Sequence, residues 1–314
     1  MHVRIGIGHR NQAAMLGIGF MMFLFGLCGC QSSDAGMDAR FPLPSSPPEL
    51  GQGKPFEAGV LKYEVSLPHN GISTRLLLFT SDAPATKKRP CIFIAPAGTR
   101  LFHGSALDDG NPPEYLPYVH AGYSVVAYEL DGDLSENPKD AEIYTAAQAF
   151  MKADGGLADA RLAIDYALAK LPNIDTQRLY VAGHSSAATV ALYVAEHEPR
   201  IKACIAYAPV CYLEERLPAV LINVLTNKIP GYRRFVHRVS PSTDVTKLAC
   251  PVFLFHADDD TNVPTDEVAR FADELKKTNK QVTFARVQTG NHYESMIEQG
   301  IPQAIEWLKK LPGS

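Results

Sequence analysis

Serines, carboxylates and a histidine stand in three short stretches whose residue types fit nucleophilic catalysis. The stretches are Gly-His-Ser-Ser-Ala at 183–187, three consecutive aspartates at 258–260, and His292 within Gly-Asn-His-Tyr. A serine hydroxyl is a weak nucleophile until a base takes its proton, and an imidazole acts best as that base when a carboxylate orients it. The residue types therefore predict acyl transfer through a serine.

The two adjacent serines differ in their neighbours. They follow the apolar run Arg-Leu-Tyr-Val-Ala and precede an apolar-periodic segment, which predicts a strand, a tight turn and a helix. The residues two before and two after the nucleophile crowd together in such a turn, so both must be small. Centring on Ser185 puts Gly183 and Ala187 in those positions, whereas centring on Ser186 would put His184 in the first. We therefore predict Ser185 as the nucleophile and the backbone N–H of Ser186 as an oxyanion donor, with no role for the Ser186 hydroxyl. The alternative is a serine-rich helix N-cap without chemistry.

A mostly parallel sheet is expected to position these residues. A strand pair around the Asn-Gly turn is followed by apolar runs of strand length, which alternate with segments of helical periodicity. The expected strands are 91–95, 124–130, 178–183, 202–208, 251–256 and 282–288, and the expected helices are 156–171, 187–198, 265–278 and 301–311. This alternation predicts a doubly wound α/β domain with an N-terminal antiparallel hairpin and with reactive groups at the carboxyl ends of the strands. The segment 212–243 is longer than a crossover needs and predicts a cap-like insertion.

The strand-turn-helix with Gly-x-Ser-x-small, taken with the acidic and histidine stretches, resembles the α/β-hydrolase superfamily. The stretch His-Ala-Asp-Asp-Asp-Thr-Asn-Val-Pro at 256–264 is similar to the family's His-Gly-x-x-Asp-x-x-Val-Pro. This resemblance implies that Asp260 is the acid, with Asp258 and Asp259 as rivals. It also implies that His292, the one histidine after the acid, is the base, in the family's chain order of Ser, acid, His. His256 corresponds to a structural position of the family.

The family's mechanism implies a role for each of these residues. Ser185 would attack an acyl carbonyl, His292 would act as base and then as acid, and Asp260 would fix the imidazole tautomer. A second oxyanion donor is expected from the loop after the first core strand, with the Ala97 N–H favoured over Gly98. No cofactor is needed. No metal is expected either, because the three adjacent aspartates lack the spaced loop of a calcium site.

Residues from about Phe56 to Leu311 carry the resemblance. Within the superfamily, the stretch 240–260 is most similar to the dienelactone hydrolase and prolyl oligopeptidase-like branch. Peptidases of that branch usually have an aromatic, glycine-rich nucleophile elbow, which is the strand-turn-helix that holds the serine, and a β-propeller ahead of the catalytic domain. This chain has Gly-His-Ser-Ser-Ala-Ala and a short tether, which favours a carboxylester hydrolase. A prolyl oligopeptidase-like serine peptidase, acyl transfer to an acceptor other than water, and a non-catalytic surface-binding lipoprotein are the alternatives.

The N-terminus predicts export. Basic residues precede a long apolar run, which is typical of a secretory signal. The run ends in Leu-Cys-Gly-Cys, which resembles the lipobox of bacterial lipoproteins and implies cleavage before Cys30 and acylation of its thiol. Gln31 is not Asp, which favours the outer membrane; plain secretion is the alternative. The expected organisation is a signal peptide at 1–29, a Ser-, Pro- and Gly-rich flexible tether at 30–56, and the hydrolase domain at 57–314.

The composition limits the classes of binding partner that we expect. The chain is 46% hydrophobic and 20% charged with a net charge of −4, which predicts one large core and argues against nucleic-acid binding. The expected partners are a small-molecule or peptide acyl substrate and, through the lipid anchor, a membrane. Cys91, Cys204 and Cys250 lie in or beside apolar runs and are expected to be buried as small hydrophobic residues. Whether a disulfide forms is left open.

Overall fold

The computed structural model describes residues 40–108, 112–171 and 173–312. One nine-stranded sheet runs through them in the order β1-β2-β3-β5-β4-β6-β7-β8-β9. Its strands are β1 (Lys54–Glu57), β2 (Val60–His69), β3 (Ile72–Ser81), β4 (Arg89–Ile94), β5 (Ser124–Tyr128), β6 (Ile174–His184), β7 (Ile201–Tyr207), β8 (Val252–Ala257) and β9 (Val282–Val287). Strands β4 to β9 are mutually parallel, and β1 to β3 add an antiparallel edge that joins the sheet through β5. The predicted α/β-hydrolase architecture is confirmed.

The Asn-Gly turn joins β2 and β3 as expected. Asn70 and Gly71 both have positive φ, 46° and 81°, as a type I′ hairpin turn requires. The two strands then pair in an unbroken antiparallel register from His69↔Ile72 to Val60↔Ser81. This turn sets which residues of β2 face the core.

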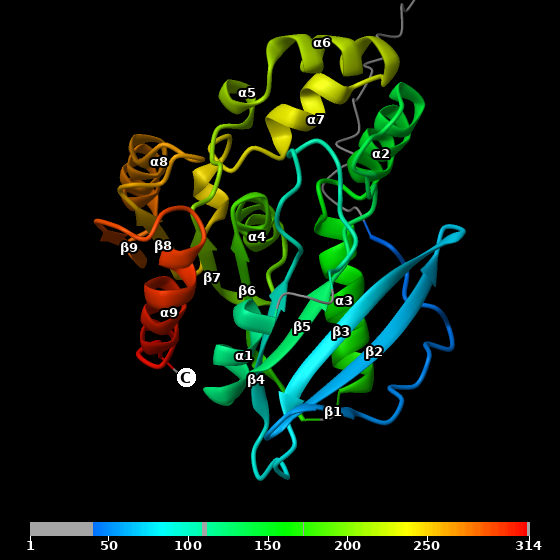
Figure 1. Cartoon of the computed structure of the whole chain (residues 1–314), viewed down its shortest axis with the longest axis vertical. Coiled ribbons are helices and arrows are strands. Elements are labelled where there is room, and N and C mark those ends of the chain that lie inside the picture. Colours follow the sequence, from blue (N-terminus) through cyan, green and yellow to red (C-terminus); the bar gives the residue numbers. More distant parts are fainter. Residues whose placement is uncertain (1–39, 109–111, 172, 313–314) are drawn as a thin grey trace, which may run out of the picture. The chain divides into compact units, whose positions relative to one another are not determined.

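Alternate residues of each strand pack into two hydrophobic clusters on opposite faces of the sheet. On β4, Cys91 and Phe93 belong to the first cluster, whereas Ile92 and Ile94 belong to the second. The first cluster holds α3 (Leu157–Lys170), α4 (Ser186–His197) and α8 (Thr265–Thr278), and the second holds α1 (Pro112–His120) and α9 (Ile301–Leu308). The sheet is therefore covered on both faces (Figure 1).

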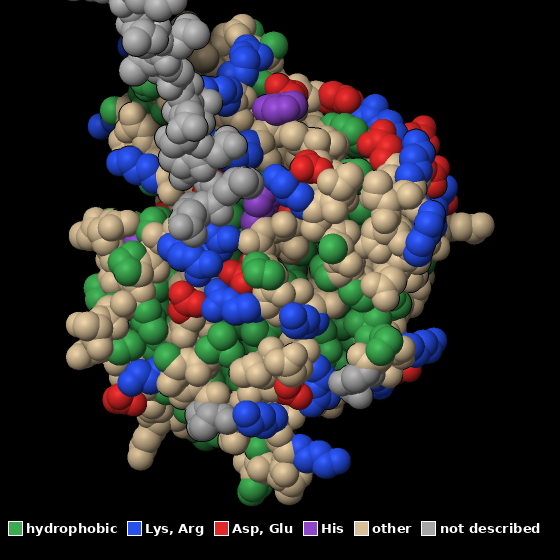
Figure 2. Space-filling view, turned by 180° about the vertical axis from the view of Figure 1, so that it is seen from behind, with side chains coloured by type: hydrophobic (Ala, Val, Ile, Leu, Met, Phe, Trp, Pro, Cys, Tyr) green, Lys and Arg blue, Asp and Glu red, His purple; other side chains and the backbone are tan. Residues whose placement is uncertain are grey.

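The insertion 212–243 forms three short helices, α5 (Leu213–Arg216), α6 (Ala219–Lys228) and α7 (Tyr232–Arg238), which lie beyond the carboxyl ends of the parallel strands (Figure 1). A further helix, α2 (Asp140–Lys152), contacts α6. Figure 2 shows basic and acidic side chains interspersed over one face of the molecule. Within the part of the chain that the structure describes, no helix has both the length and the apolarity needed to cross a membrane.

The segment expected to be a tether is packed from residue 40 onward. Phe41 is buried and stacks on His69 with ring centroids 4.2 Å apart, and β1 adds an antiparallel strand to β2. The Tyr166 hydroxyl also donates to the Pro48 carbonyl at 3.1 Å. The expected boundary at residue 57 therefore differs from the structure, because an aromatic anchor and edge-strand pairing offset the unfavourable composition. The expected signal peptide, Cys30 and the first part of the tether lie outside the described residues.

Candidate active site

Ser185 occupies a strained turn between β6 and α4. Its backbone has φ 55° and ψ −122°, in a region that costs non-glycine residues on the order of 1–3 kcal/mol. The turn is held by the Ser185 N–H, which donates to the Tyr207 carbonyl at 2.8 Å. A Cβ atom on Gly183 would lie 2.3 Å from the Ala187 carbonyl oxygen, so the two flanking positions do crowd together. Only glycine fits at 183 in this turn.

The Ser186 hydroxyl has a contact that sequence reasoning missed. Ser186 is buried, and its Oγ accepts the Thr99 backbone N–H at 3.1 Å. Thr99 lies in the loop after β4, which also holds Ala97. The second serine therefore fastens this loop to the elbow, and a local motif gives no signal of such a contact.

Asp260 holds His292 at the ends of β8 and β9. Its Oδ2 lies 2.7 Å from His292 Nδ1, while its Oδ1 accepts the backbone N–H groups of Asn262 at 2.7 Å and Val263 at 3.0 Å. Burial of the carboxylate acts to raise its pKa, but these hydrogen bonds outweigh it and hold the Asp260 pKa below its ordinary value. An ionised, oriented carboxylate beside an imidazole is the arrangement that a histidine base requires.

The two neighbouring aspartates have other partners. Asp258 forms an ion pair with Arg286 at 2.7 Å. Asp259 accepts the backbone N–H groups of Gly290 and Asn291 at 3.1 and 2.8 Å, so it holds the turn just before His292. Of the three, Asp260 is the one that contacts the histidine.

Two further histidines support this arrangement. His184 lies against His292, with ring centroids 4.5 Å apart, and its Nε2 is 2.8 Å from the His292 carbonyl oxygen. Burial, with a smaller contribution from the nearby His292, lowers the His184 pKa to about 4, so a neutral His184 donates this hydrogen bond. His256 is fully buried and bonds to the Val263 carbonyl at 3.1 Å, which suits the structural position expected for it.

A pocket of about 330 Å³ opens at this edge of the sheet. It is lined by Ser185 and His292, by the β4 loop, by the start of the cap and by the acid loop: Thr99, Arg100, Leu101, Ser185, Ser186, Val210, Arg216, Leu217, Pro218, Asn262, Val263 and His292. Ala97 is not among these described lining residues. Arg100 and Arg216 supply positive charge, and no acidic side chain is among the described residues that line it. The predicted nucleophile and base thus share one cationic pocket.

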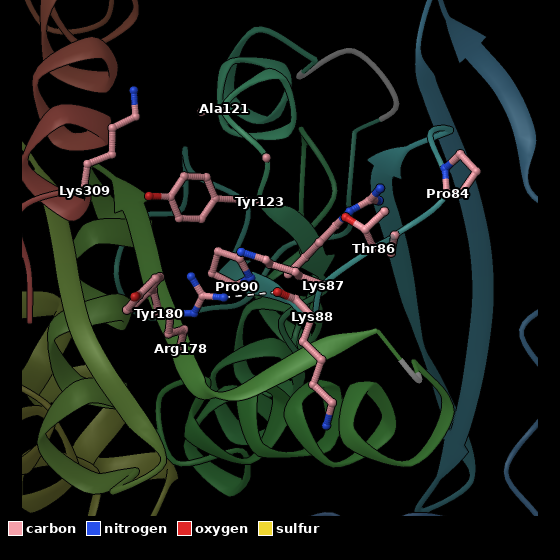
Figure 3. Close-up of a pocket in the computed structure, with 13 residues that line it drawn as sticks. Pro84, Thr86, Lys87, Lys88, Pro90, Ala121, Tyr123, Arg178, Tyr180 and Lys309 are labelled. Atoms are coloured by element: carbon pink, nitrogen blue, oxygen red, sulfur yellow. Dashed lines mark hydrogen bonds between the residues drawn. The ribbon is translucent and has the colours of Figure 1, made fainter. Parts of the chain in front are cut away.

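A larger pocket of about 430 Å³ lies at the opposite edge, near the amino ends of β4 and β5. Figure 3 shows Lys87, Lys88, Arg178 and Lys309 around it, with the Arg178 guanidinium donating to the Lys88 carbonyl at 3.1 Å. Ser185 follows the carboxyl end of β6, so this basic pocket is separate from the site that holds the serine.

Residues 116–312 match the model of the prolyl oligopeptidase family. The chain belongs to the prolyl oligopeptidase family. It is therefore a hydrolase of the α/β-hydrolase superfamily. Membership of this family supports a serine as the nucleophile of the chain. No curated protein matches the sequence.

Solved structures share this hydrolase's fold. An acetyl xylan esterase from Paenibacillus sp. R4 aligns with a TM-score of 0.61 at 18% identity, covering 87% of this chain and 91% of that one. An esterase from Pyrococcus furiosus aligns with a TM-score of 0.56 at 18% identity, covering 84% of this chain and 98% of that one. An acylaminoacyl peptidase from Pyrococcus horikoshii aligns with a TM-score of 0.61 at 16% identity, covering 80% of this chain but 40% of that one.

Proposed function

We propose that this hydrolase cleaves a carboxylic ester through an acyl-enzyme on Ser185. His292 takes the hydroxyl proton as Ser185 Oγ bonds to the acyl carbon, and then gives it to the departing alcohol. Water, deprotonated by the same imidazole, then attacks the acyl carbon; the bond to Ser185 Oγ breaks, Oγ takes the proton back from His292, and the acid is released. The observation that carries this proposal is the 2.7 Å contact between Asp260 and His292, because His292 lines the same pocket as Ser185 in its strained turn.

The backbone N–H groups of Ser186 and Ala97 are the proposed oxyanion donors. Ser186 is the first residue of α4, where backbone donors and the helix dipole favour a developing negative charge. The hydrogen bond from Thr99 to the Ser186 hydroxyl holds the Ala97 loop next to the elbow. This contact supports the pairing of the two donors.

The extent of the structural matches supports an ester over a peptide bond. The two esterases align over 91% and 98% of their length, whereas the acylaminoacyl peptidase aligns over 40% of its length. A serine peptidase of the same family is the second candidate, because the triad chemistry is shared.

The charge of the pocket supports a preference for esters with a negative group near the scissile bond. Arg100 and Arg216 both line the pocket, one from the β4 loop and one from the end of α5. Arginine binds carboxylate or phosphate oxygens through planar, paired N–H groups. The basic residues of α7 do not line this pocket: Arg233 contacts Asn223, and His237 pairs with Glu214.

A fluorophosphonate probe tests the catalytic proposal on the full chain. We expect labelling of the wild type, of Ser186→Ala and of Ser66→Ala, an exposed serine of β2, and loss of labelling in Ser185→Ala. Labelling that survives in Ser185→Ala would contradict the assignment. Turnover of p-nitrophenyl acetate and of N-acylated peptide p-nitroanilides then separates the two candidates, because a peptidase would release p-nitroaniline from the peptides and an esterase would not.

We also propose that Cys30 is lipid-modified and anchors the chain to the outer membrane, with the domain outside the cytoplasm. The apolar run, the Leu-Cys-Gly-Cys motif and Gln31 support this localisation. Metabolic labelling with an alkyne fatty acid should mark the wild type and Cys28→Ser, and should leave Cys30→Ser unmarked and released from the membrane fraction. Equal labelling of the two variants would refute lipidation at Cys30.

A further inference from the structure

A histidine and two aspartates meet away from the active site. His69 is the last residue of β2, Asp131 follows β5, and Asp159 lies in the first turn of α3. One potential ligand atom from each of the three lies within 4.8 Å of the others. Two ligands at about 2.0–2.2 Å from one ion lie no more than about 4.4 Å apart, so a small movement of the side chains would let the three atoms bind one cation.

The cluster is buried and holds atoms without partners. The side chain of His69 is fully buried, Asp159 is 0% exposed, and the Asp131 side chain is 11% exposed. His69 Nε2 lies 3.5 Å from Asp131 Oδ1 and 2.6 Å from Thr74 Oγ1, a hydrogen bond that an ion bound through Nε2 would replace, while His69 Nδ1 and Asp159 Oδ1 have no hydrogen-bond partner. A buried polar atom without a partner costs about 1–3 kcal/mol, so each of these two atoms needs an explanation.

The charges around Asp159 make its burial unfavourable without a cation. The Asp131 N–H donates to Asp159 Oδ2 at 3.1 Å, and the nearby side chains of Asp131 and Glu129 are both acidic. Glu129 is itself bonded by Arg75 at 3.3 Å. Buried carboxylates are ordinarily paired with a cation or ligate a metal.

We propose that His69, Asp131 and Asp159 form a zinc-binding site. A mixed set of one imidazole and two carboxylates suits zinc, whereas calcium and magnesium prefer all-oxygen shells. The partial exposure of Asp131 gives the ion a route from solvent and leaves room for a water ligand.

The site would join three elements that are distant in sequence. Phe41 stacks on His69, so the first described residues of the chain cover one side of the cluster. The loop at Asp131 is linked to the segment that continues from the Ala97 loop, through Gly104 N–H to the Gly132 carbonyl at 3.0 Å and Ala106 N–H to Asp133 at 3.1 Å. A bound ion would therefore link the turn end of the β2–β3 hairpin, α3 and the loop at Asp131, which contacts the continuation of the Ala97 loop.

The experiment measures zinc binding and thermal unfolding of the untagged full chain after chelator treatment. We expect one equivalent of zinc and a rise in Tm of about 5–10 °C at a hundredfold excess over the Kd. Cobalt in place of zinc should give visible absorption bands from ligation by a nitrogen and two oxygens. These readouts do not depend on esterase activity, so they remain informative if the proposed function fails.

Variants locate the ion. His69→Gln and Asp159→Asn should lose the bound zinc and the Tm rise, and Asp131→Asn serves if either fails to fold. Asp165→Asn on the same helix and His120→Gln on α1 are matched controls that should bind as the wild type does. Absence of stoichiometric zinc would overturn the site. A Tm that rises in Asp131→Asn and does not change with zinc would also overturn it, because that result means that the two carboxyls share a proton. Unchanged binding in His69→Gln and Asp131→Asn would also overturn it.

Discussion

His184 contacts His292 in two ways: the rings lie 4.5 Å apart at an interplanar angle of 49°, and His184 Nε2 is 2.8 Å from the His292 carbonyl. The residue just before the proposed nucleophile thus positions the backbone and the ring of the proposed base. Asp260 holds the same imidazole through Nδ1. His292 is fixed from both the elbow and the acid loop.

Replacing His184 should impair catalysis without removing the serine. His184→Phe keeps an aromatic ring against His292 but loses the donor, and we expect kcat to fall about tenfold, as for one lost hydrogen bond. His184→Gln can return an N–H near the same position and should recover most of the rate. Steady-state kinetics on p-nitrophenyl acetate check this, and equal kcat values for the two variants would contradict a positioning role.

The Ser186 hydroxyl should affect kcat but should not change which serine the fluorophosphonate probe labels. Ser186→Ala removes the acceptor of the Thr99 N–H and loosens the loop that contains Ala97. We expect kcat to fall about tenfold with little change in KM, because the oxyanion donors act in the transition state. Ser66→Ala is the matched control. A rise in KM at unchanged kcat would instead mean that this contact shapes substrate binding.

Arg216 should set the preference for charged substrates. Its Nη2 donates to the Asn262 carbonyl at 2.7 Å, and its side chain lines the pocket with Ser185. Arg216→Gln should raise KM for the p-nitrophenyl hemiester of succinate by about tenfold and leave p-nitrophenyl acetate nearly unchanged. Arg233→Gln, on the exposed face of α7, is the control. The same loss on both substrates would show a structural effect of the variant.

Sequence patterns were sufficient for the sheet and for the residues within the elbow. The alternation of apolar runs with helical segments predicts the parallel strands, and the crowding at Gly183 predicts the strained backbone at Ser185 and not at Ser186. Both signals are local, since strand period and turn sterics depend on residues close in the chain.

Contacts between distant segments could not be read in this way. The Thr99–Ser186 hydrogen bond joins the ends of β4 and β6, and the His184–His292 contact joins the ends of β6 and β9. The helix α1 escaped prediction because it contains Pro117, which normally disfavours a helix interior. Packing of 40–56 depends on Phe41 meeting His69, which the composition of that segment does not reveal.

Glu114 should make stability depend on pH. It is 7% exposed on α1, and burial raises its pKa to about 7 although a hydrogen bond with Tyr293 acts to lower it. Because the folded pKa lies above the unfolded value of 4.5, ionisation costs stability progressively as pH rises from 4.5 to 7, and the cost is complete above 7.

Glu114→Gln removes this ionisation. Relative to wild type it should gain roughly 2 kcal/mol in unfolding free energy between pH 5 and pH 8. Urea unfolding at the two pH values measures the gain, with the exposed Glu136→Gln as control. A difference between Glu114→Gln and wild type that stays constant with pH would mean that this carboxyl titrates near its ordinary value, and that its burial beside Tyr293 is relieved by solvent.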